Sequence, residues 1–462
     1  MTNDLTVDIA VVGLGPGGEA VATRLAEAGL VVAGIEARLV GGECPYFACV
    51  PTKMMIRAAD SIAEAHRVSE LAGAAEVRPD WGPVARRIRA EATDDWDDQV
   101  AVDRLVAAGV EFVRGRATIT GPGELAVSGP DGERVVRARR GIVLNPGTDP
   151  SVPSIPGLAD TPLWTNRDAV AVEVVPESLI VIGGGPVGCE FAQVFARFGA
   201  KVTVIEVGER LLGVDEPEAG DLLARRFDAE HILVRTGAKI TSVTHDGHRF
   251  TVEFDGADPV SAARLLVAAG RRTDLAALGV NAVGLDDSAK GIEVDDRMRA
   301  ADGVWAIGDV TGKGAFTHMS MYQADIAVAD ILGEDSPRAD YRAVPRVTFT
   351  APEVGSVGLS EAAAHAAGLT VRTGIAQISS SARGWIHKVG NEGFIKLVED
   401  VDRGVLVGAT SAGPTGGEVL GALTVAVHAE VPVDDLRRMI YAYPTFHRTI
   451  SDALADLRKQ RP

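Results

Sequence analysis

The hydrophobic pattern at the start of the chain predicts a buried strand that leads into a helix. Residues 7–12 form an apolar run of the kind found in parallel strands that are covered on both faces. A glycine-rich turn follows at 13–18, and an Ala-rich stretch of helical character continues to residue 28. A second apolar run, residues 30–35, ends at Glu36. This order of strand, glycine turn, helix, strand and acid predicts a Rossmann-type unit.

The glycines and the acid of this unit indicate what it binds. The turn carries Gly13, Gly15 and Gly18, and Glu36 lies 18 residues after the last of them. Such glycines let a pyrophosphate reach the helix N-terminus, and the acid can accept hydrogen bonds from ribose hydroxyls. A lone glycine motif is weak, but its place between strand and helix predicts a dinucleotide site.

The same pattern recurs 170 residues further along the chain. Gly183, Gly185 and Gly188 follow an apolar run at 179–182, and Glu206 ends the next apolar run, with a helix expected over 189–198. Cys189 lies just inside that helix, where we expect it to pack on the sheet rather than take part in redox chemistry. The sequence therefore predicts a second dinucleotide site.

The segments around these two units differ in character. The sequence of residues 54–110 predicts helices. Residues 110–143 alternate between apolar and polar residues with glycine-rich turns, which is typical of strands and hairpins. A stretch rich in Pro and Gly, beginning at residue 145, marks a domain crossing.

Two of the three cysteines, Cys44 and Cys49, lie in a short stretch after the first unit. Five steps of regular helix span about 7.5 Å, which exceeds the distance that a disulfide tolerates. Because the residue before a proline avoids helical geometry, Pro45 predicts Cys44 in an extended lead-in and Cys49 in the first helical turn. Gly42 allows a close approach of a flat ring. The alternatives are two unrelated buried thiols or half of a metal site. A metal site would need further Cys or His ligands, and none lies nearby in sequence, so we expect a redox-active pair and no metal.

The length, composition and charge of the chain further limit the classes of partner and function that we expect. The length of 462 residues suggests two to four domains, and the formal charge of −18 argues against nucleic acid or an anionic membrane as partner. We find no signal peptide and no apolar stretch of membrane-spanning length, so we expect a cytoplasmic protein. A disulfide in that compartment is usually catalytic.

Nearly the whole chain resembles the flavoprotein disulfide reductases, which include dihydrolipoyl dehydrogenase, glutathione and mycothione reductases and mercuric reductase. The shared motifs are 41–53 with both cysteines, the second glycine turn ending in Cys189-Glu190, 269–274 with Gly270, 306–310 with Asp309, Thr317-His318, and 344–359. The resemblance implies an α/β fold with two Rossmann-like domains and a C-terminal α+β dimerisation domain. The implied boundaries are 1–150 with 275–340 for FAD, 151–274 for NAD(P) and 341–462 for dimerisation.

The resemblance also implies roles for single residues. FAD would bind the first glycine turn, with Glu36 on the ribose and Asp309 on the ribityl or pyrophosphate region. The second turn would hold NAD(P)H. Cys49 would face the flavin, Cys44 would exchange with substrate, and Lys53 would pair with Glu190 near the flavin. Glu206 should repel a 2′-phosphate, so we expect NADH rather than NADPH, although Arg210 could instead reach a phosphate.

One departure from the family concerns the acid–base dyad, a histidine and a glutamate near the C-terminus of the partner subunit. Tyr443 occupies the histidine position and Arg448 the glutamate position. An unperturbed tyrosine has a pKa near 10, so it is a poor proton acceptor at neutral pH. His447 is a candidate substitute base. Mercuric reductase also lacks the histidine but carries a C-terminal cysteine pair, whereas no cysteine follows Cys189 here.

The sequence thus predicts a homodimeric FAD-dependent NAD(P)H oxidoreductase with its active site shared between subunits. Electrons would pass from nicotinamide through flavin to the Cys44–Cys49 pair and on to a small-molecule acceptor or disulfide. Three alternatives stay open. They are a dihydrolipoyl dehydrogenase or reductase of another small disulfide, a quinone or metal-ion reductase, and a non-catalytic flavoprotein redox sensor.

Overall fold

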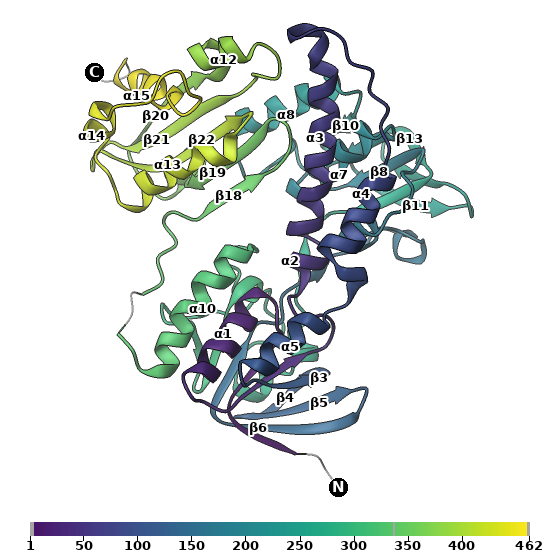
Figure 1. Ribbon diagram of the computed structural model, residues 1–462, viewed down its shortest axis with the longest axis vertical. Helices are drawn as coiled ribbons and strands as arrows, with labels where there is room; N and C mark the ends of the chain where they lie inside the picture. Colours follow the sequence, from purple (N-terminus) through teal and green to yellow (C-terminus); the bar gives the residue numbers. More distant parts are fainter. Residues whose placement is uncertain (1–3, 336–337, 460–462) are drawn as a thin grey trace. The chain divides into compact units, whose positions relative to one another are not determined.

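In a computed structural model, residues 4–335 and 338–459 are described, and their contacts divide the chain into two units (Figure 1). The first unit comprises Met1–Pro51, Arg86–Ser151 and Arg271–Tyr341. The second comprises Thr52–Ala85, Val152–Gly270 and Arg342–Pro462. The chain therefore leaves the first unit three times and returns to it twice.

A largely parallel sheet forms the centre of the first unit, with strand order β16-β17-β6-β1-β2-β3. Its strands are β1 (Leu5–Val12), β2 (Val32–Glu36), β3 (Glu111–Arg114), β6 (Gly132–Leu144), β16 (Arg299–Ala301) and β17 (Val304–Ala306). The predicted hairpins are present as β4 (Arg116–Gly121) and β5 (Glu124–Gly129), which continue into β6.

The apolar run of β1 is continuous because both faces of this strand are buried. Val7 and Ala10 belong to one hydrophobic core, while Ile9 and Val11 belong to the other. Helices α1 (Pro16–Glu27) and α10 (Thr317–Leu332) contribute to the second core, together with α5 (Gln99–Ala107). The two cores hold β1 in place, so its C-terminal end is a fixed point from which the first glycine turn starts.

The second unit contains a parallel sheet of order β10-β9-β8-β14. Its members are β8 (Ser178–Ile182), β9 (Lys201–Ile205), β10 (Leu233–Arg235) and β14 (Arg264–Val267). Helix α7 (Pro186–Arg197) follows β8 and begins three residues before the position expected from sequence, because Pro186 suits the first helical position. Helix α8 (Pro217–Ala229) and the three-stranded sheet β11 (Ile240–His245), β12 (Phe250–Phe254) and β13 (Ala257–Ala262) complete this part.

An antiparallel sheet of order β18-β19-β22-β21-β20 forms the C-terminal part of the second unit. Its strands are β18 (Pro345–Thr348), β19 (Glu353–Gly358), β20 (Val371–Gln377), β21 (Phe394–Asp400) and β22 (Val405–Gly413). Helices α13 (Gly416–His428) and α15 (Thr449–Lys459) share a hydrophobic core with it. The short helices α11 (Glu361–Ala366), α12 (Ala382–His387) and α14 (Val433–Arg438) connect its strands and helices.

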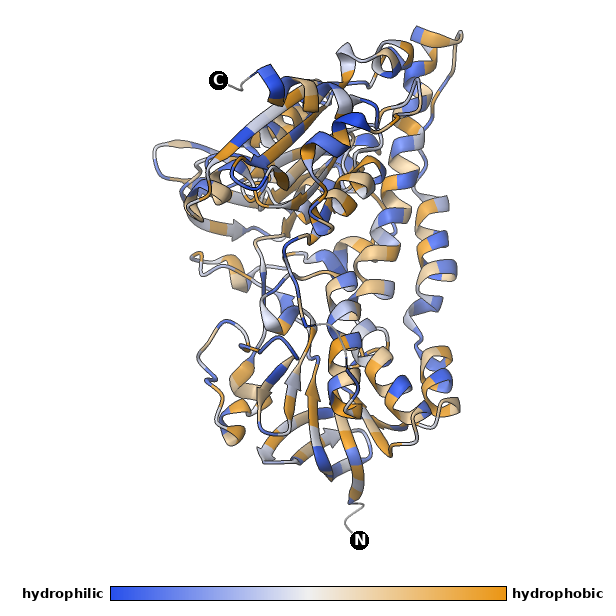
Figure 2. Cartoon of the chain, turned by 90° about the vertical axis from the view of Figure 1, so that its left-hand side faces the viewer, coloured by the Kyte–Doolittle hydropathy of each residue, from blue (hydrophilic) through white to orange (hydrophobic). Residues whose placement is uncertain are grey.

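The segment predicted as helical after the cysteines is a series of helices rather than one. Helix α3 (Cys49–Leu71) is the longest, and α4 (Gly82–Arg87) follows it. Positive φ angles at Asp94, Asp95 and Trp96 then break the helical path before α5. Figure 2 shows hydrophilic and hydrophobic residues interleaved along the long helices. Among the described residues, no helix is both long and apolar enough to cross a membrane.

Candidate active site

The first glycine turn is shaped by close backbone contacts. Gly13 has φ +87°, and a Cβ there would lie 2.2 Å from the Asn145 carbonyl oxygen. A Cβ on Gly18 would lie 2.0 Å from the Gly13 carbonyl oxygen, so glycine is required at both positions. Gly15 is the N-cap of α1 and supplies no side-chain hydrogen bond to the first turn, which Pro16 opens. The uncapped backbone N–H groups at the start of α1 therefore form a binding site suited to an anion.

The second glycine turn repeats this geometry. Gly183 has φ +117°, and a Cβ there would lie 2.4 Å from the Ala268 carbonyl oxygen. A Cβ on Gly188 would lie 2.0 Å from the Gly183 carbonyl oxygen. Gly185 is the N-cap of α7, again without a side-chain cap and again followed by proline. Gly270 follows β14 with φ +108° and is exposed.

The two strand-terminal acids also occupy equivalent positions. The Glu36 carboxylate accepts hydrogen bonds from the Leu14 and Arg38 amides, at 2.8 and 2.7 Å. The Glu206 carboxylate accepts them from the Gly184 and Gly208 amides, at 2.5 and 2.6 Å. Each acid is thus fixed to its own glycine turn, where ribose hydroxyls of a dinucleotide would lie.

Burial raises the pKa of Glu36, and the hydrogen bonds from Leu14 and Arg38 offset only part of this effect.

The cysteine stretch packs on the first glycine turn. Gly42 has φ +66°, and a Cβ there would lie 3.0 Å from the Cα of Gly15. Cys44 and Cys49 follow within seven residues of Gly42, and both are half-buried. The Cys49 Sγ lies 3.4 Å from the Thr317 Oγ1, within hydrogen-bonding distance. Thr317, to which no role was assigned from sequence, therefore contacts the predicted flavin-facing thiol.

The prediction for Cys44 was wrong, whereas that for Cys49 is confirmed. Cys44 lies in a short helix, α2 (Glu43–Tyr46), instead of an extended segment. Pro45 is tolerated there because the first turn of a helix does not use the amide that proline lacks. Cys49 is the first residue of α3, as expected.

Lys53 and Glu190 form the pair that was expected from the resemblance. Their side chains lie 2.8 Å apart, and the Glu190 side chain is only 8% exposed. Glu190 also accepts a hydrogen bond from the Phe349 amide at 2.9 Å, and the Lys53 ammonium lies 4.6 Å from the centre of the Phe349 ring. Lys53 is one helical turn after Cys49 on α3. The pair is thus held in place by the segment that precedes β19.

The Asp309 carboxylate is tied to residues that sequence analysis did not assign. Thr148 donates a hydrogen bond to Asp309 at 2.7 Å, and Arg271 donates to Thr148 at 2.6 Å. Asn145 donates to the Gly13 carbonyl at 3.2 Å and accepts from Ser320 at 3.2 Å. The segment 145–148 therefore supports both the glycine turn and Asp309. These residues are more than 100 positions from their partners, so no local pattern could reveal them.

The C-terminal segment places Tyr443 and His447 in different surroundings. Tyr443 is 70% exposed, and the Arg448 guanidinium lies 5.6 Å from its ring centre. The His447 ring lies 6.1 Å from the ring of Tyr441, which is buried and donates a hydrogen bond to the Leu436 carbonyl. Burial raises the pKa of Tyr441. Tyr443 is thus a solvent-facing phenol, and His447 packs beside a core tyrosine.

Cys189 is fully buried, and its Sγ lies 3.3 Å from the Gly184 carbonyl oxygen. Burial, the largest effect, raises the pKa of this thiol, and the charges of Glu190 and Glu206 act in the same direction. A thiol held in its protonated form is a poor nucleophile, which fits the expected packing role.

Comparison with known proteins identifies the family. A model described as pyridine nucleotide-disulphide oxidoreductase matches residues 7–328, and one for the dimerisation domain of the same family matches residues 344–454. The chain belongs to the pyridine nucleotide-disulphide oxidoreductase family. The predicted fold class is thereby confirmed.

The relatives of this oxidoreductase carry more than one activity. A dihydrolipoyl dehydrogenase of Chlorobaculum tepidum is 34% identical, over 97% of this chain and 96% of its own length. A mercuric reductase of Acidithiobacillus ferrooxidans is 33% identical, over 96% of this chain and 81% of its own. The HOCl-induced flavoprotein disulfide reductase RclA from Escherichia coli has a TM-score of 0.84 at 25% identity, covering 97% and 99% of the two chains.

As a member of this family, the protein is an oxidoreductase that uses FAD and NAD(P)H. The residues fit these cofactors. Each glycine turn offers an uncapped helix N-terminus for a pyrophosphate, and each is followed by a strand-terminal acid for ribose hydroxyls. Among the described residues there is no group of three or more His, Cys, Asp or Glu side chains suited to a metal ion.

Arg197 joins the helix that carries Lys53 to the helix that carries Glu190. It lies near the end of α7, is 6% exposed, and binds Asp60 of α3 at 2.6 Å and Glu230 at 2.8 Å. Burial alone would raise the pKa of Glu230, but hydrogen bonds from Arg197 and the charge of Arg226 outweigh it and lower this pKa.

Replacing Arg197 with methionine should lower the free energy of unfolding by about 2 kcal/mol, because Glu230, whose side chain is 11% exposed, and the partly exposed Asp60 both lose this buried arginine as a partner. Chemical denaturation of the FAD-loaded enzyme measures this change. Arg225→Met, on the exposed side of α8, is the matched control and should stay within about 0.5 kcal/mol of the unmodified protein. A loss below about 1 kcal/mol for Arg197→Met would contradict the structural role.

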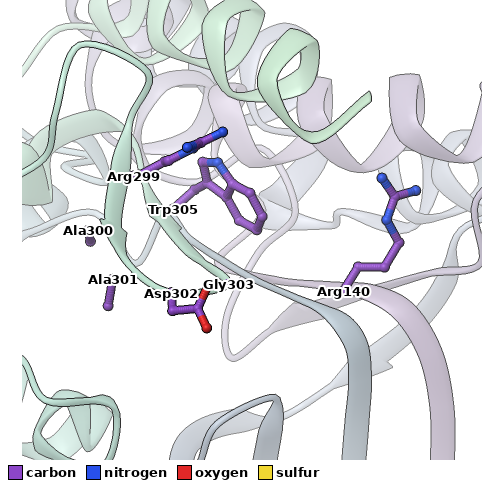
Figure 3. A pocket seen from close by; sticks show the side chains of 7 residues that line it. All are labelled: Arg140, Arg299, Ala300, Ala301, Asp302, Gly303 and Trp305. Atoms are coloured by element: carbon purple, nitrogen blue, oxygen red, sulfur yellow. The ribbon is translucent and has the colours of Figure 1, made fainter. Parts of the chain in front are cut away.

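A cavity of about 540 Å³ lies at the β16–β17 hairpin of the first unit (Figure 3). Figure 3 shows Trp305 between Arg299 and Arg140. Arg299 and Trp305 both donate hydrogen bonds to Asp330, and Arg140 donates to the Ile331 carbonyl. These contacts stabilise the C-terminal end of α10. We interpret the cavity as a consequence of the contacts that cap this helix.

Proposed function

We propose that the enzyme passes electrons from NADH, through FAD on the first glycine turn, to the Cys44–Cys49 pair and then to a small acceptor. The observation that carries this proposal is the contact of Gly42 with Gly15, because it attaches the cysteine stretch to the first dinucleotide site. We assign residues 1–150 with 275–340 to the FAD domain, 151–274 to the NAD(P) domain and 341–462 to dimerisation.

The residues of the chain would perform distinct parts of this reaction. Bound FAD would supply the two-electron chemistry that connects a hydride donor with a disulfide. Cleavage of the Cys44–Cys49 bond takes up two electrons and leaves both sulfurs reduced. Cys49, at the start of α3 and beside Thr317, would stay a thiolate, since a helix N-terminus and a hydroxyl donor both favour that form. Cys44 would attack the substrate disulfide.

We also propose that the enzyme acts as a homodimer in the cytoplasm. The dimerisation domain of the family spans residues 344–454. Near its end, Met439, Ile440 and Tyr443 are 46%, 96% and 70% exposed, which is unusual for such apolar side chains in a monomer. We propose that the partner subunit covers them and that Tyr443 reaches the partner's cysteines.

A panel of acceptors tests the proposed function directly. NADH oxidation would be followed with small disulfides, quinones and metal ions, each against a blank without acceptor. Turnover with a disulfide supports the proposal. Turnover with quinones or metal ions alone supports a reductase of those acceptors, and no turnover with any of them supports a redox sensor.

A dihydrolipoyl dehydrogenase is the second candidate, because a relative with that name is 34% identical over nearly the full length of both chains. The exposed Tyr443, at the position where the family carries a histidine, argues against dihydrolipoyl dehydrogenase activity.

NADH should be preferred over NADPH by about tenfold or more in kcat/KM. Glu206 would lie beside a 2′-phosphate, and two like charges in a partly buried site repel each other by ~1.4 kcal/mol or more, which is a factor of about ten. Arg210 does not relieve this repulsion, since its Nη2 donates to the Gly213 and Asp215 carbonyls of its own loop. Steady-state kinetics with both nucleotides measure the ratio. Equal or higher efficiency with NADPH would contradict the assignment.

A further inference from the structure

We propose that Lys396 is a positioning residue for the pyridine-nucleotide site, acting through the loop that carries Glu206. This inference rests on the proposal that the second glycine turn holds NAD(P)H. Lys396 lies on β21, a strand whose residues are all buried, and its own side chain is 5% exposed. A lone lysine in such a strand needs a reason, because burying a charge is costly unless it is paired.

Three carboxylates surround the Lys396 ammonium. It lies 3.0 Å from Glu216 and 2.8 Å from each of Glu218 and Glu361. Glu216 is itself 3% exposed and accepts a second hydrogen bond from the Glu361 amide at 2.7 Å. Burial alone would lower the pKa of Lys396, but the hydrogen bonds to these acids outweigh it and raise this pKa, so the lysine remains charged.

Glu216 stands at the end of the loop that begins with Glu206. It is the N-cap of α8, and its neighbour Asp215 is 5% exposed. Asp215 accepts hydrogen bonds from Arg346 at 2.9 Å and from Ser356 at 2.6 Å. Residues of the antiparallel sheet therefore bind both Asp215 and Glu216 at this end of the loop.

The other end of the loop is fixed to the glycine turn. Glu206 accepts from the Gly184 amide, and the Leu212 amide donates to the Gly184 carbonyl at 2.9 Å. Leu212 is fully buried with φ +50°, a conformation that needs support from its surroundings. Arg210 donates to the Asp215 carbonyl and so connects the middle of the loop with the held end.

Loss of the Lys396 charge would leave three acids close together, with the buried Glu216 short of a partner. Like charges in a buried site repel, so the end of the loop would move away from the sheet. The displacement would pass through Asp215 and Leu212 to Gly184 and Glu206, which would weaken nucleotide binding. Lys396 itself contacts neither the proposed nucleotide turn nor the cysteines, so the chemical step should be unaffected.

The test compares Lys396→Met with Lys396→Arg in the FAD-loaded enzyme. Calorimetric titration of the oxidised enzyme with NAD⁺ should give a Kd about tenfold higher for Lys396→Met, within the range usual for coupling between sites. The KM for NADH should rise by a similar factor while kcat at saturating NADH and the FAD content stay constant. Lys396→Arg, which keeps the charge, should restore most of the affinity. Lys201→Met, an exposed lysine at the start of β9, is the matched control.

A folded Lys396→Met enzyme with unchanged Kd for NAD⁺ would overturn the inference, as would a fall in kcat without a rise in KM. If Lys396→Met does not fold, Glu216→Gln decides in its place, and unchanged NAD⁺ affinity there would overturn the inference equally. Failure of the unmodified enzyme to bind NAD⁺ would instead refute the nucleotide assignment of the second turn.

Discussion

Oxidation of dihydrolipoamide by this enzyme should be slower by about 10²–10⁴-fold than NADH-driven reduction of its best acceptor, because general acid–base catalysis is worth that much. We infer from the sequence resemblance that Tyr443 stands where the family carries a histidine, and Arg448 where it carries the glutamate that orients this histidine. A phenol with a pKa near 10 accepts a proton poorly at neutral pH. Steady-state assays in both directions provide the comparison.

Tyr443→Phe separates a chemical role of Tyr443 from a packing role. The substitution removes the hydroxyl and keeps the ring, so turnover with the best acceptor should fall if the phenol donates a hydrogen bond near Cys44. Unchanged turnover would leave only packing at the dimer interface. Fast dihydrolipoamide oxidation by the unmodified enzyme would contradict the whole argument and identify a dihydrolipoyl dehydrogenase with an unusual base.

The two cysteine substitutions should give opposite spectra. Cys44→Ser leaves a thiolate at Cys49, so the oxidised enzyme should show a long-wavelength band from the thiolate beside the flavin. Cys49→Ser should show no such band. Both should lose disulfide reduction by about 10³-fold or more, since the two sulfurs act as a unit.

Cys189→Ala is the matched control for these variants, because Cys189 is fully buried in α7 and should leave both the band and the activity intact. Activity with quinones that survives in Cys44→Ser would show electron transfer that bypasses the cysteine pair. A band that persists in Cys49→Ser would contradict the assignment of Cys49.

The local parts of this architecture could be predicted from sequence, because their signals lie within about 30 residues. The glycine turns, their acids and the hairpins after residue 110 are set by short patterns of apolar, glycine and acidic residues. The position of Cys44 was missed because the rule for residues before proline is weaker in the first turn of a helix.

The supporting contacts could not be predicted, since they join residues far apart in the chain. Arg197 binds Asp60 across 137 positions, and Lys396 binds Glu216 across 180. Asn145 reaches Gly13 across 132 positions. In the sequence alone, nothing distinguishes these side chains from ordinary polar residues. Their roles follow from burial and pairing, which depend on the tertiary fold.

Anaerobic titration of the oxidised, FAD-loaded enzyme with NADH tests the central claim most directly. Two electrons per flavin should produce the long-wavelength band of a Cys49 thiolate beside an oxidised flavin, and further reductant should be needed to bleach the yellow colour. Bleaching of the flavin by the first equivalent of NADH, without that band, would show that electrons do not reach the Cys44–Cys49 pair.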